Sequence, residues 1–168
     1  DLIVADTYST RDAVITEFDV KPQNISVIPL AASNIQNIPS FDFLEKYDID
    51  GLYFLFVSTL EPRKNLTRLL QAYDSLPLSI KGKMKLVIVG GKGWGEVNLL
   101  DTITQLDLIE CVKVLGRVDD TVLATLYANA QFLVMPSLYE GFGLPLVEAM
   151  SYGTPVLTAN NSSMPEVA

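Results

Sequence analysis

The chain has 168 residues, with 12 Lys and Arg against 20 Asp and Glu, no histidine, one cysteine and 49% apolar residues. This length suits one domain with a sizeable core, and the charged fraction of only 19% excludes a wholly disordered chain. A net charge of −8 argues against a dedicated nucleic-acid or anionic-membrane binder, because either would need a basic face. Without histidine the chain itself can form neither a Ser-His-Asp triad nor a histidine-bound zinc site, and lone Cys111 can form no internal disulfide.

The first predicted unit is a strand, a helix and a strand, at residues 2–5, 7–18 and 25–28. Residues 33–40 carry no hydrophobic period and are predicted to form a connector, which separates residues 1–32 from residues 41–168. The chain begins with an apolar run and no initiator Met, and it ends where a helix is starting near Met164. We therefore interpret the sequence as a piece of a longer protein.

After the connector, short apolar runs alternate with segments of helical period. The runs predict strands at 52–57, 85–89, 112–115, 131–135 and 155–158, and the periodic segments predict helices at 65–76, 96–108, 122–130 and 144–152. Strands without apolar–polar alternation are buried on both faces, as in a parallel sheet between two layers of helices. The predicted fold class is therefore α/β, with a doubly wound, mostly parallel, Rossmann-like sheet. Ligands of such sheets bind at the carboxyl ends of the strands, so the loops there are searched for a site.

The loop that follows the predicted strand 85–89 reads Gly-Gly-Lys-Gly-Trp-Gly at residues 90–95. Glycines between a strand and a helix let a ligand approach the backbone, and we expect them to leave N–H groups free for an anion. The loop does not fit the dinucleotide-binding fingerprint, because Glu96 stands where its third glycine would be, and the P-loop spacing is also missing. A tight turn without a ligand remains an alternative, and Trp94 could equally cover the core.

The loop that follows the predicted strand 52–57 ends in Arg63, Lys64 and Asn65. Asn65 is predicted to be the N-cap of the next helix. Two cations at a helix N-terminus oppose the helix dipole by about 0.3–1 kcal/mol each, and a bound anion would resolve this conflict. The alternative is a pair of solvated charges.

Residues 136–150 combine glycines, a proline and two glutamates around the start of a predicted helix. Gly141 and Gly143 precede the helix, and Pro145 fits its first turn, where a missing N–H has no cost. Glu140 and Glu148 are eight positions apart, so a continuous helix would separate them by about 12 Å, wider than the roughly 5–9.5 Å of glycosidase carboxylate pairs. We expect them to hold two ends of one elongated ligand through its hydroxyl groups, the alternative being two exposed glutamates without a ligand.

These motifs together resemble the group 1 family of retaining glycosyltransferases, which have the GT-B fold. The resemblance rests on Glu-Pro-Arg-Lys-Asn at 61–65, on Ser-Leu-Tyr-Glu-Gly-Phe-Gly-Leu-Pro at 137–145 with Glu148, and on Asn-Asn-Ser-Ser-Met-Pro-Glu at 160–166. It covers essentially the whole chain. It implies that residues 1–32 end the N-terminal, acceptor-side domain, and that residues 41–168 are the nucleotide-sugar-binding domain, truncated at its C-terminus.

The resemblance also implies a role for each matching residue. Lys64 would hold the donor diphosphate with help from Arg63, and Glu140 would lie near the donor sugar, so these three are the candidate catalytic residues. Glu148 would accept hydrogen bonds from the ribose hydroxyls. The other candidate substrate-binding residues are Gly141, Phe142, Gly143 and Leu144 in one loop, Gly91, Lys92, Gly93 and Trp94 in the glycine-rich loop, and Arg117 and Val118 beside the base. Many members carry a second diphosphate-binding arginine near the position of Ser58, so Arg63 or Lys92 must substitute for it here.

We therefore expect the full-length protein to be a retaining hexosyltransferase that uses a nucleoside-diphosphate sugar, either GDP-mannose or a UDP-sugar, with neither a cofactor nor a metal. Its acceptor, a glycan or a lipid-linked saccharide, would bind the missing part of the N-terminal domain, so this chain alone should be inactive. The expected location is cytoplasmic, at the inner membrane surface in the full-length protein, with no nucleic-acid partner and no transmembrane segment. Three alternatives stay open: a non-catalytic nucleotide- or sugar-sensing module, a nicotinamide-dependent dehydrogenase and a scaffold.

Overall fold

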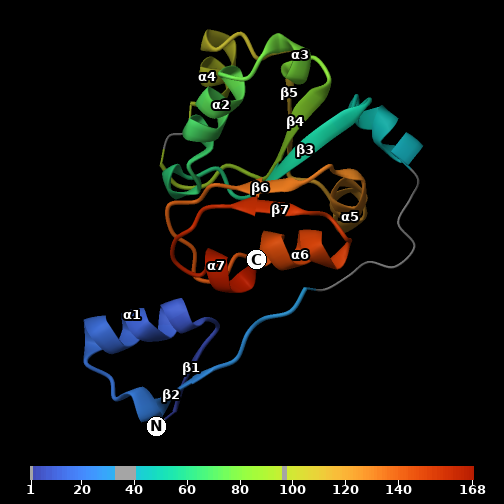
Figure 1. Cartoon of the computed structure of the whole chain (residues 1–168). Coiled ribbons are helices and arrows are strands. Elements are labelled where there is room, and N and C mark those ends of the chain that lie inside the picture. The colour runs from blue at the N-terminus through green and yellow to red at the C-terminus, as the bar shows by residue number, and fades with distance from the viewer. Residues whose placement is uncertain (1, 33–40, 96–97) are drawn as a thin grey trace.

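The computed structural model describes residues 2–32, 41–95 and 98–168, and its largest feature is a five-stranded sheet whose strand pairs are all parallel (Figure 1). The strands are β3 (Leu52–Val57), β4 (Met84–Val89), β5 (Val112–Gly116), β6 (Leu133–Met135) and β7 (Val156–Thr158). Their order across the sheet is β5-β4-β3-β6-β7. The doubly wound parallel sheet predicted from the sequence is therefore confirmed.

The strand order reverses direction once. From β3 the chain moves outward through β4 to β5, then returns to the other side of β3 to form β6 and continues outward to β7. β3 pairs with β4 along its whole length, whereas its pairing with β6 is centred on Leu55 and Leu133. The carboxyl ends of β3 and β6 therefore flank the topological switch point, where ligands bind in sheets of this kind.

Helices cover both faces of the sheet. The helical segments after β3 are the 3₁₀ turn η3 (Pro62–Lys64) and the helices α2 (Leu66–Asp74), α3 (Leu78–Lys81), α4 (Leu99–Gln105), α5 (Asp120–Asn129), α6 (Leu144–Ser151) and α7 (Met164–Val167). α2 and α4 pack on Phe54 and Phe56 of β3, and α5 and α6 pack on Tyr53 and Leu55 from the opposite face. Successive strand residues are thus buried on opposite sides, which explains why the strands read as unbroken apolar runs.

Several element boundaries differ from the sequence prediction. α4 covers only part of the predicted helix 96–108, and residues 96 and 97 lie outside the described part of the chain, as does the predicted connector 33–40. α2 ends at Asp74 rather than at residue 76, because Ser75 already occupies the C-cap. α3 was not predicted, since a four-residue helix is too short to show a helical period.

The chain starts with a separate small sheet. β1 (Ile3–Ala5) and β2 (Ile25–Val27) are parallel neighbours that α1 (Tyr8–Phe18) connects along the chain, as the predicted strand–helix–strand unit requires. A 3₁₀ turn at Pro22–Asn24 precedes β2. These two strands do not join the five-stranded sheet, and Figure 1 shows this unit at one end of the molecule. A further 3₁₀ segment at Phe41–Tyr47 leads into β3 and lies beside α5. Throughout the described residues, no helix has both the length and the apolar character that crossing a bilayer demands.

Candidate functional site

Two loops meet at the switch point, one after β3 and one after β6. The backbone N–H of Leu138 donates to the carbonyl oxygen of Arg63 over 2.8 Å, and the side-chain amide of Asn65 donates to the carbonyl oxygen of Pro136 over 3.0 Å. Asn65 does occupy the N-cap position of α2, but its side chain makes no capping bond, so that part of the prediction is wrong. Its left-handed backbone, with φ 60°, directs the side chain to the neighbouring loop instead of the first turn of α2.

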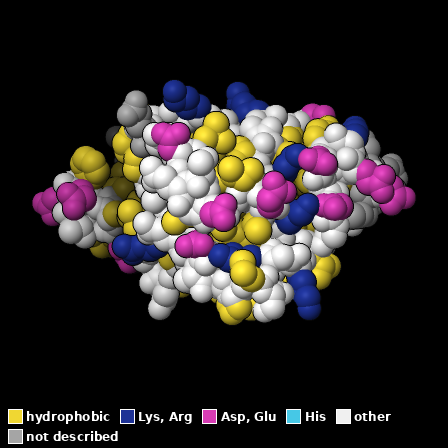
Figure 2. Space-filling view, turned by 90° about the horizontal axis from the view of Figure 1, so that it is seen from above, with side chains coloured by type: hydrophobic (Ala, Val, Ile, Leu, Met, Phe, Trp, Pro, Cys, Tyr) yellow, Lys and Arg dark blue, Asp and Glu magenta, His cyan; other side chains and the backbone are white. Residues whose placement is uncertain are grey.

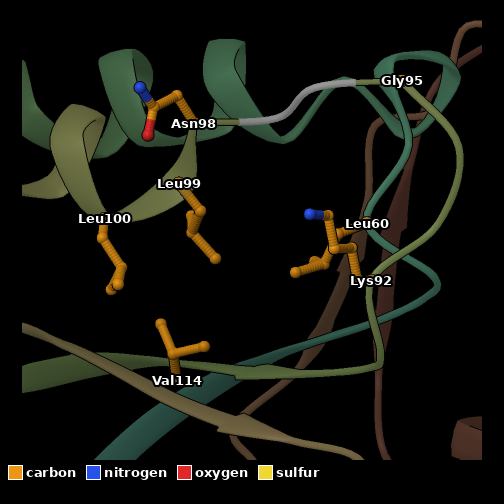
Figure 3. A pocket seen from close by; sticks show the side chains of 7 residues that line it. All are labelled: Leu60, Lys92, Gly95, Asn98, Leu99, Leu100 and Val114. Carbon is orange, nitrogen blue, oxygen red and sulfur yellow. The ribbon is translucent and has the colours of Figure 1, made fainter.

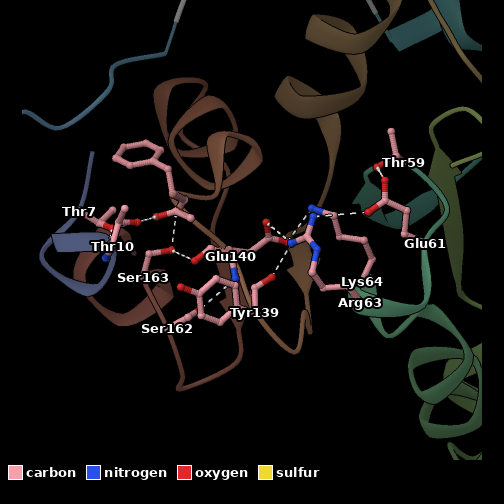
Figure 4. A network of polar contacts seen from close by, with 12 residues as sticks. Thr7, Thr10, Thr59, Glu61, Arg63, Lys64, Tyr139, Glu140, Ser162 and Ser163 are labelled. Atoms are coloured by element: carbon pink, nitrogen blue, oxygen red, sulfur yellow. Dashed lines mark hydrogen bonds and ion pairs between the residues drawn. The ribbon is translucent and has the colours of Figure 1, made fainter. Parts of the chain in front are cut away.

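The two loops bring Lys64, Arg63 and Glu140 into one ion cluster (Figure 4). Lys64 Nζ lies 2.6 Å from Glu140 Oε1, and an Arg63 guanidinium nitrogen lies 2.9 Å from Glu140 Oε2. Arg63 also donates to the carbonyl oxygen of Tyr139 and lies 3.5 Å from a carboxylate oxygen of Glu61. The three residues proposed from the sequence as catalytic are thus in direct contact.

The cluster is largely shielded from solvent. The side chains of Lys64 and Glu140 are 11% and 7% exposed, whereas Arg63 is 34% exposed and faces partly outward. Burial alone would raise the pKa of Glu140, but hydrogen bonds from Lys64 and Arg63, together with the Lys64 charge, outweigh it and lower the pKa. Glu140 therefore stays ionised, and neither cation is a free solvated charge.

The backbone of residues 140–143 is held by its carbonyl groups. Ser163 Oγ lies 3.0 Å from the carbonyl oxygens of both Glu140 and Phe142, and the Gly141 carbonyl accepts from threonine hydroxyls of the first unit. Because the C=O and the following N–H of a peptide point in opposite directions, the N–H groups of Gly141, Phe142 and Gly143 face away from these hydroxyls. None of these three N–H groups donates a hydrogen bond to another described residue. Successive unpaired N–H groups of this kind attract anions.

Gly143 ends this loop and forms the N-cap of α6. Its φ of 100° suits glycine, and a Cβ there would lie 3.2 Å from Leu146 Cδ1. Pro145 stands in the first turn of α6, as predicted. Phe142 is buried, whereas Leu144 is 42% exposed at the start of the helix. Phe142 can therefore offer a ligand its backbone only.

Glu148 lies on α6 and is half-buried. It accepts a hydrogen bond of 2.7 Å from the hydroxyl of Tyr127 on α5. Tyr127 is 1% exposed, its ring stacks on Tyr152, and its carbonyl accepts from the Thr154 hydroxyl. Glu140 precedes α6, so the 12 Å separation considered for a continuous helix does not apply to the two glutamates.

The glycine-rich loop after β4 continues the pairing of β3 and β4. Leu60 forms a parallel bridge with Lys92, in which the Gly93 N–H donates to the Leu60 carbonyl over 3.3 Å. The Gly90 N–H donates to the Gly116 carbonyl over 2.8 Å. The expectation that this loop leaves its N–H groups free is therefore wrong for two of its glycines, because the sheet uses them.

The remaining predicted residues lie around this loop. Trp94 is 65% exposed, so it does not cover the core. The Arg117 side chain lies over Gly91, where a Cβ would come within 3.0 Å of it. Val118 is half-buried and packs against the core cluster that includes residues of α5.

A pocket of about 440 Å³ adjoins the glycine-rich loop on the α4 side (Figure 3). Its lining consists of Leu60, Lys92, Gly95, Asn98, Leu99, Leu100 and Val114. It shares Lys92 with the predicted site but none of the ion cluster. The polar site at the switch point and this mainly apolar hollow are therefore distinct features of the same strand ends.

The surface seen in Figure 2 has acidic and basic side chains interspersed, without a broad basic area. Across residues 2–32, 41–95 and 98–168, no three Asp, Glu or Cys side chains gather as metal ligands would. The candidate site of this chain is thus a cluster of ion pairs beside unpaired backbone N–H groups, at the point where strand order reverses.

A family comparison agrees with this geometry. The sequence model described as glycosyl transferases group 1 matches residues 42–168, which is most of the chain. The chain belongs to this family. The recognition made from the sequence motifs is confirmed, and the five-stranded sheet is the GT-B type of this glycosyltransferase family.

Individual relatives agree with the family match. The O-antigen chain mannosyltransferase B of Escherichia coli is 38% identical over 99% of this glycosyltransferase chain, and O-antigen chain mannosyltransferase RfbU of Salmonella typhimurium is 30% identical over 92%. The chain spans only 45% and 40% of those two proteins. The crystal structure of HepE from Anabaena in complex with UDP and glucose matches with a TM-score of 0.85 and 25% identity, over 99% of this chain and 46% of HepE.

Some residues of this glycosyltransferase site were missed by sequence reasoning. Tyr127 lies in the predicted helix 122–130 and fits its apolar period, which does not indicate the bond to Glu148. Ser163 stands within the segment 160–166 that resembles the family, but the segment received no role. The hydroxyl pattern of that segment was the available signal, because buried hydroxyls need partners.

Proposed function

We propose that the chain binds a nucleoside-diphosphate sugar at the carboxyl ends of β3 and β6. In the full-length protein the sugar is transferred, with retention of its anomeric configuration, to a glycan or a lipid-linked saccharide. The observation that carries this proposal is the contact of Lys64 and Arg63 with Glu140 beside three unpaired N–H groups. Lysine, arginine and successive unpaired N–H groups are groups that bind phosphates, and here they lie at the carboxyl ends of two strands that flank the switch point.

The diphosphate binds to the cations and to the loop backbone. In the cluster Lys64 and Arg63 face the carboxylates of Glu140 and Glu61, so the phosphates bind to the remaining N–H donors of the two cations and not to a net positive charge. Arg63, the more exposed cation, donates to the phosphates with its remaining guanidinium N–H groups, while Lys64 keeps its bond to Glu140 and donates with another N–H group. As the glycosidic bond breaks, negative charge grows on the leaving phosphate, and these preorganised donors stabilise it.

The two glutamates bind the two ends of the ligand. Glu140 accepts from hydroxyl groups of the donor sugar, and Glu148 accepts from the ribose hydroxyls, since carboxylates accept several hydrogen bonds each. The backbone of Arg117 and Val118 meets the base, and the loop from Gly91 to Trp94 lies beside the nucleotide. No metal ion is required, because Lys64, Arg63 and the loop N–H groups carry the positive charge.

The relatives narrow the choice of donor. Two of them are named as mannosyltransferases of the O-antigen chain, which favours GDP-mannose as the donor and a growing polysaccharide as the acceptor. HepE, in contrast, was crystallised with UDP, which keeps a UDP-sugar as the alternative. The acceptor binds the N-terminal domain, of which residues 1–32 are the last part, on the cytoplasmic side of the membrane.

Calorimetry on the full-length protein tests the binding step. We expect GDP or UDP to bind in the micromolar range or tighter, and NAD to bind far more weakly, since the glycine fingerprint of nicotinamide enzymes is missing. Incubation with the preferred donor and a saccharide acceptor then tests transfer, and NMR of the product reports the anomeric configuration. Binding without any transfer would identify a sensing module instead, and an inverted product would refute retention. Failure of every nucleoside diphosphate to bind would refute the proposal itself.

A further inference from the structure

The loop 140–143 is connected to the first unit of the chain. Thr7 Oγ1 and Thr10 Oγ1 lie 2.8 and 3.2 Å from the carbonyl oxygen of Gly141 and 2.8 Å from each other (Figure 4). Thr7 is also the N-cap of α1, because its side chain accepts from the Thr10 N–H over 3.0 Å. The N-terminus of α1 therefore contacts the backbone of loop 140–143 directly.

A carboxylate from the far end of the chain completes this contact. Glu166 accepts hydrogen bonds from the backbone N–H groups of Tyr8 and Ser9, over 2.9 and 3.0 Å. Both N–H groups belong to the first turn of α1, which contains no acidic residue of its own. Glu166 thus supplies the negative charge that a helix N-terminus favours, although it lies 157 positions or more away in the sequence.

The segment 160–166, which carries Glu166, also forms hydrogen bonds with loop 140–143. Ser162 Oγ accepts from the backbone N–H of Glu140 over 3.0 Å, and Ser163 Oγ shares its hydrogen between the carbonyl oxygens of Glu140 and Phe142. Together with the threonines on Gly141, hydroxyl groups therefore engage three consecutive carbonyls. These bonds fix the direction of the following N–H groups, which are the ones left unpaired.

We propose that Glu166 and the first turn of α1 form a clasp that holds loop 140–143 in its anion-binding shape, which makes Thr7 and Glu166 positioning residues for the donor phosphates. The clasp rests on the proposed function only in the identity of the ligand. It assigns a task to the first unit besides acceptor binding, since this unit sets the geometry of the donor site across the interface. It also explains why Glu166 bonds to α1 rather than to its own helix.

The first test needs no ligand. Amide NMR signals of Gly141, Phe142 and Gly143 in the full-length protein report the orientation of their peptides. Glu166→Gln should shift these signals and those of Tyr8 and Ser9, whereas the matched control Glu110→Gln should leave them in place, since Glu110 is exposed and its side chain forms no hydrogen bond or ion pair with the described residues. Unchanged loop signals in Glu166→Gln would overturn the clasp, whatever the ligand proves to be.

The second test measures the consequence for binding. Glu166→Gln should weaken binding of a nucleoside diphosphate roughly two- to fivefold, which corresponds to loss of one charge–dipole interaction, and should leave nucleoside binding unchanged. Thr7→Val should have the same selective effect, and Thr7→Ser, which keeps the hydroxyl, should restore the affinity. Equal weakening for nucleoside and diphosphate, or no rescue by serine, would contradict a positioning role. If the wild type binds no nucleoside diphosphate, the proposed function fails, and the NMR comparison still decides the clasp.

Discussion

Tyr127 donates its hydroxyl hydrogen to Glu148 Oε2 over 2.7 Å, and this bond fixes the orientation of the carboxylate. Burial, reinforced by the charge of Glu148, raises the pKa of Tyr127, so the phenol stays protonated and acts as a donor at all physiological pH values. One carboxylate oxygen is thereby tied to α5. The other oxygen is the one left to accept from a ligand, which gives Glu148 a defined direction on a half-exposed helix.

The first prediction concerns the charge of Glu148. Glu148→Gln keeps the shape of the side chain but turns charged acceptor bonds into neutral ones, so ribonucleotide binding should weaken by about 1–3 kcal/mol. A 2′-deoxyribonucleotide lacks one hydroxyl and should lose less. Calorimetry with both ligands measures the difference.

Tyr127→Phe serves as the companion variant, since it keeps the charge and removes only the bond that orients it. We expect a smaller loss than in Glu148→Gln, again larger for the ribonucleotide. Equal losses for ribo- and deoxyribonucleotides would refute the ribose assignment. A change below about 0.5 kcal/mol in Glu148→Gln would mean that Glu148 is an ordinary solvated residue.

The second prediction concerns Lys64. Lys64→Ala should weaken nucleoside diphosphate binding by roughly 1.5–3 kcal/mol, the range of a charge-assisted hydrogen bond, and should affect nucleoside binding little. Since the substitution also leaves Glu140 with Arg63 as its remaining cation, the folded fraction has to be checked by circular dichroism before affinities are compared.

Lys83→Ala is the matched control for Lys64→Ala. Lys83 is exposed directly before β4, at the amino end of the strands and thus at the edge of the sheet opposite to the site. Lys83→Ala removes one positive charge, as Lys64→Ala does, but should leave both affinities unchanged. The same loss for nucleoside and diphosphate in Lys64→Ala would show that Lys64 does not bind the phosphates.

The fold could be predicted from the sequence because the sheet is buried on both faces, so its strands are unbroken apolar runs. Residues 52–57 form a six-residue apolar run, and β3 has those bounds. The pairing of β3 with β6 could not be predicted from the sequence, because strand order depends on packing between segments that are distant in the chain. With that order known, the rule for switch points selects the two loops that hold Lys64 and Glu140.

The direct contact of Lys64 and Arg63 with Glu140 could not be predicted from the sequence. The conflict of Arg63 and Lys64 with a helix dipole indicates an external anion, whereas in the structure the buried Glu140 pairs with both cations. Asn65 illustrates the same limit: its type fits an N-cap, but tertiary packing directs its amide to Pro136. Polar contacts between residues far apart in the chain produce no periodic sequence pattern, so the sequence does not predict them.

The third prediction concerns pH. The pKa of Glu140 is lowered in the folded state, so its ion pairs stabilise the fold above the unfolded value of about 4.3, and this stability is lost as the pH falls through the lowered folded pKa. Urea denaturation at neutral and acidic pH should therefore show a smaller acid-induced loss for Glu140→Gln than for the wild type. The variant itself should be less stable at pH 7, by roughly 1–3 kcal/mol, because Lys64 loses its counter-charge.

Exposed carboxylates provide the internal control for this pH experiment. Hydrogen bonds from Lys113 and Lys85 lower the pKa values of Asp48 and Asp50, and both groups are present in either protein. Their contributions cancel in the comparison of wild type and variant. Parallel pH profiles for the two proteins would mean that Glu140 gains nothing from its cations in the folded state.

The fourth prediction concerns the end of β4, where Gly90 lets two strands approach. Its φ is 145°, and a Cβ at this position would lie 1.7 Å from the carbonyl oxygen of Ser58. Gly90→Ala must therefore push the ends of β3 and β4 apart and disturb the bond from the Gly90 N–H to Gly116, so we expect a loss above about 4 kcal/mol in chemical denaturation.

Gly51→Ala separates this steric effect from backbone strain. Gly51 also has a positive φ, 74°, but an added Cβ would meet nothing within 4 Å, so only the left-handed backbone is penalised, by roughly 1–2 kcal/mol. The difference between the two variants measures how much the close approach of the strand ends contributes. Equal losses for the two alanines would show that the ends of β3 and β4 separate easily. The strand ends would then not be the rigid support on which the positions of Lys64 and Glu140 depend.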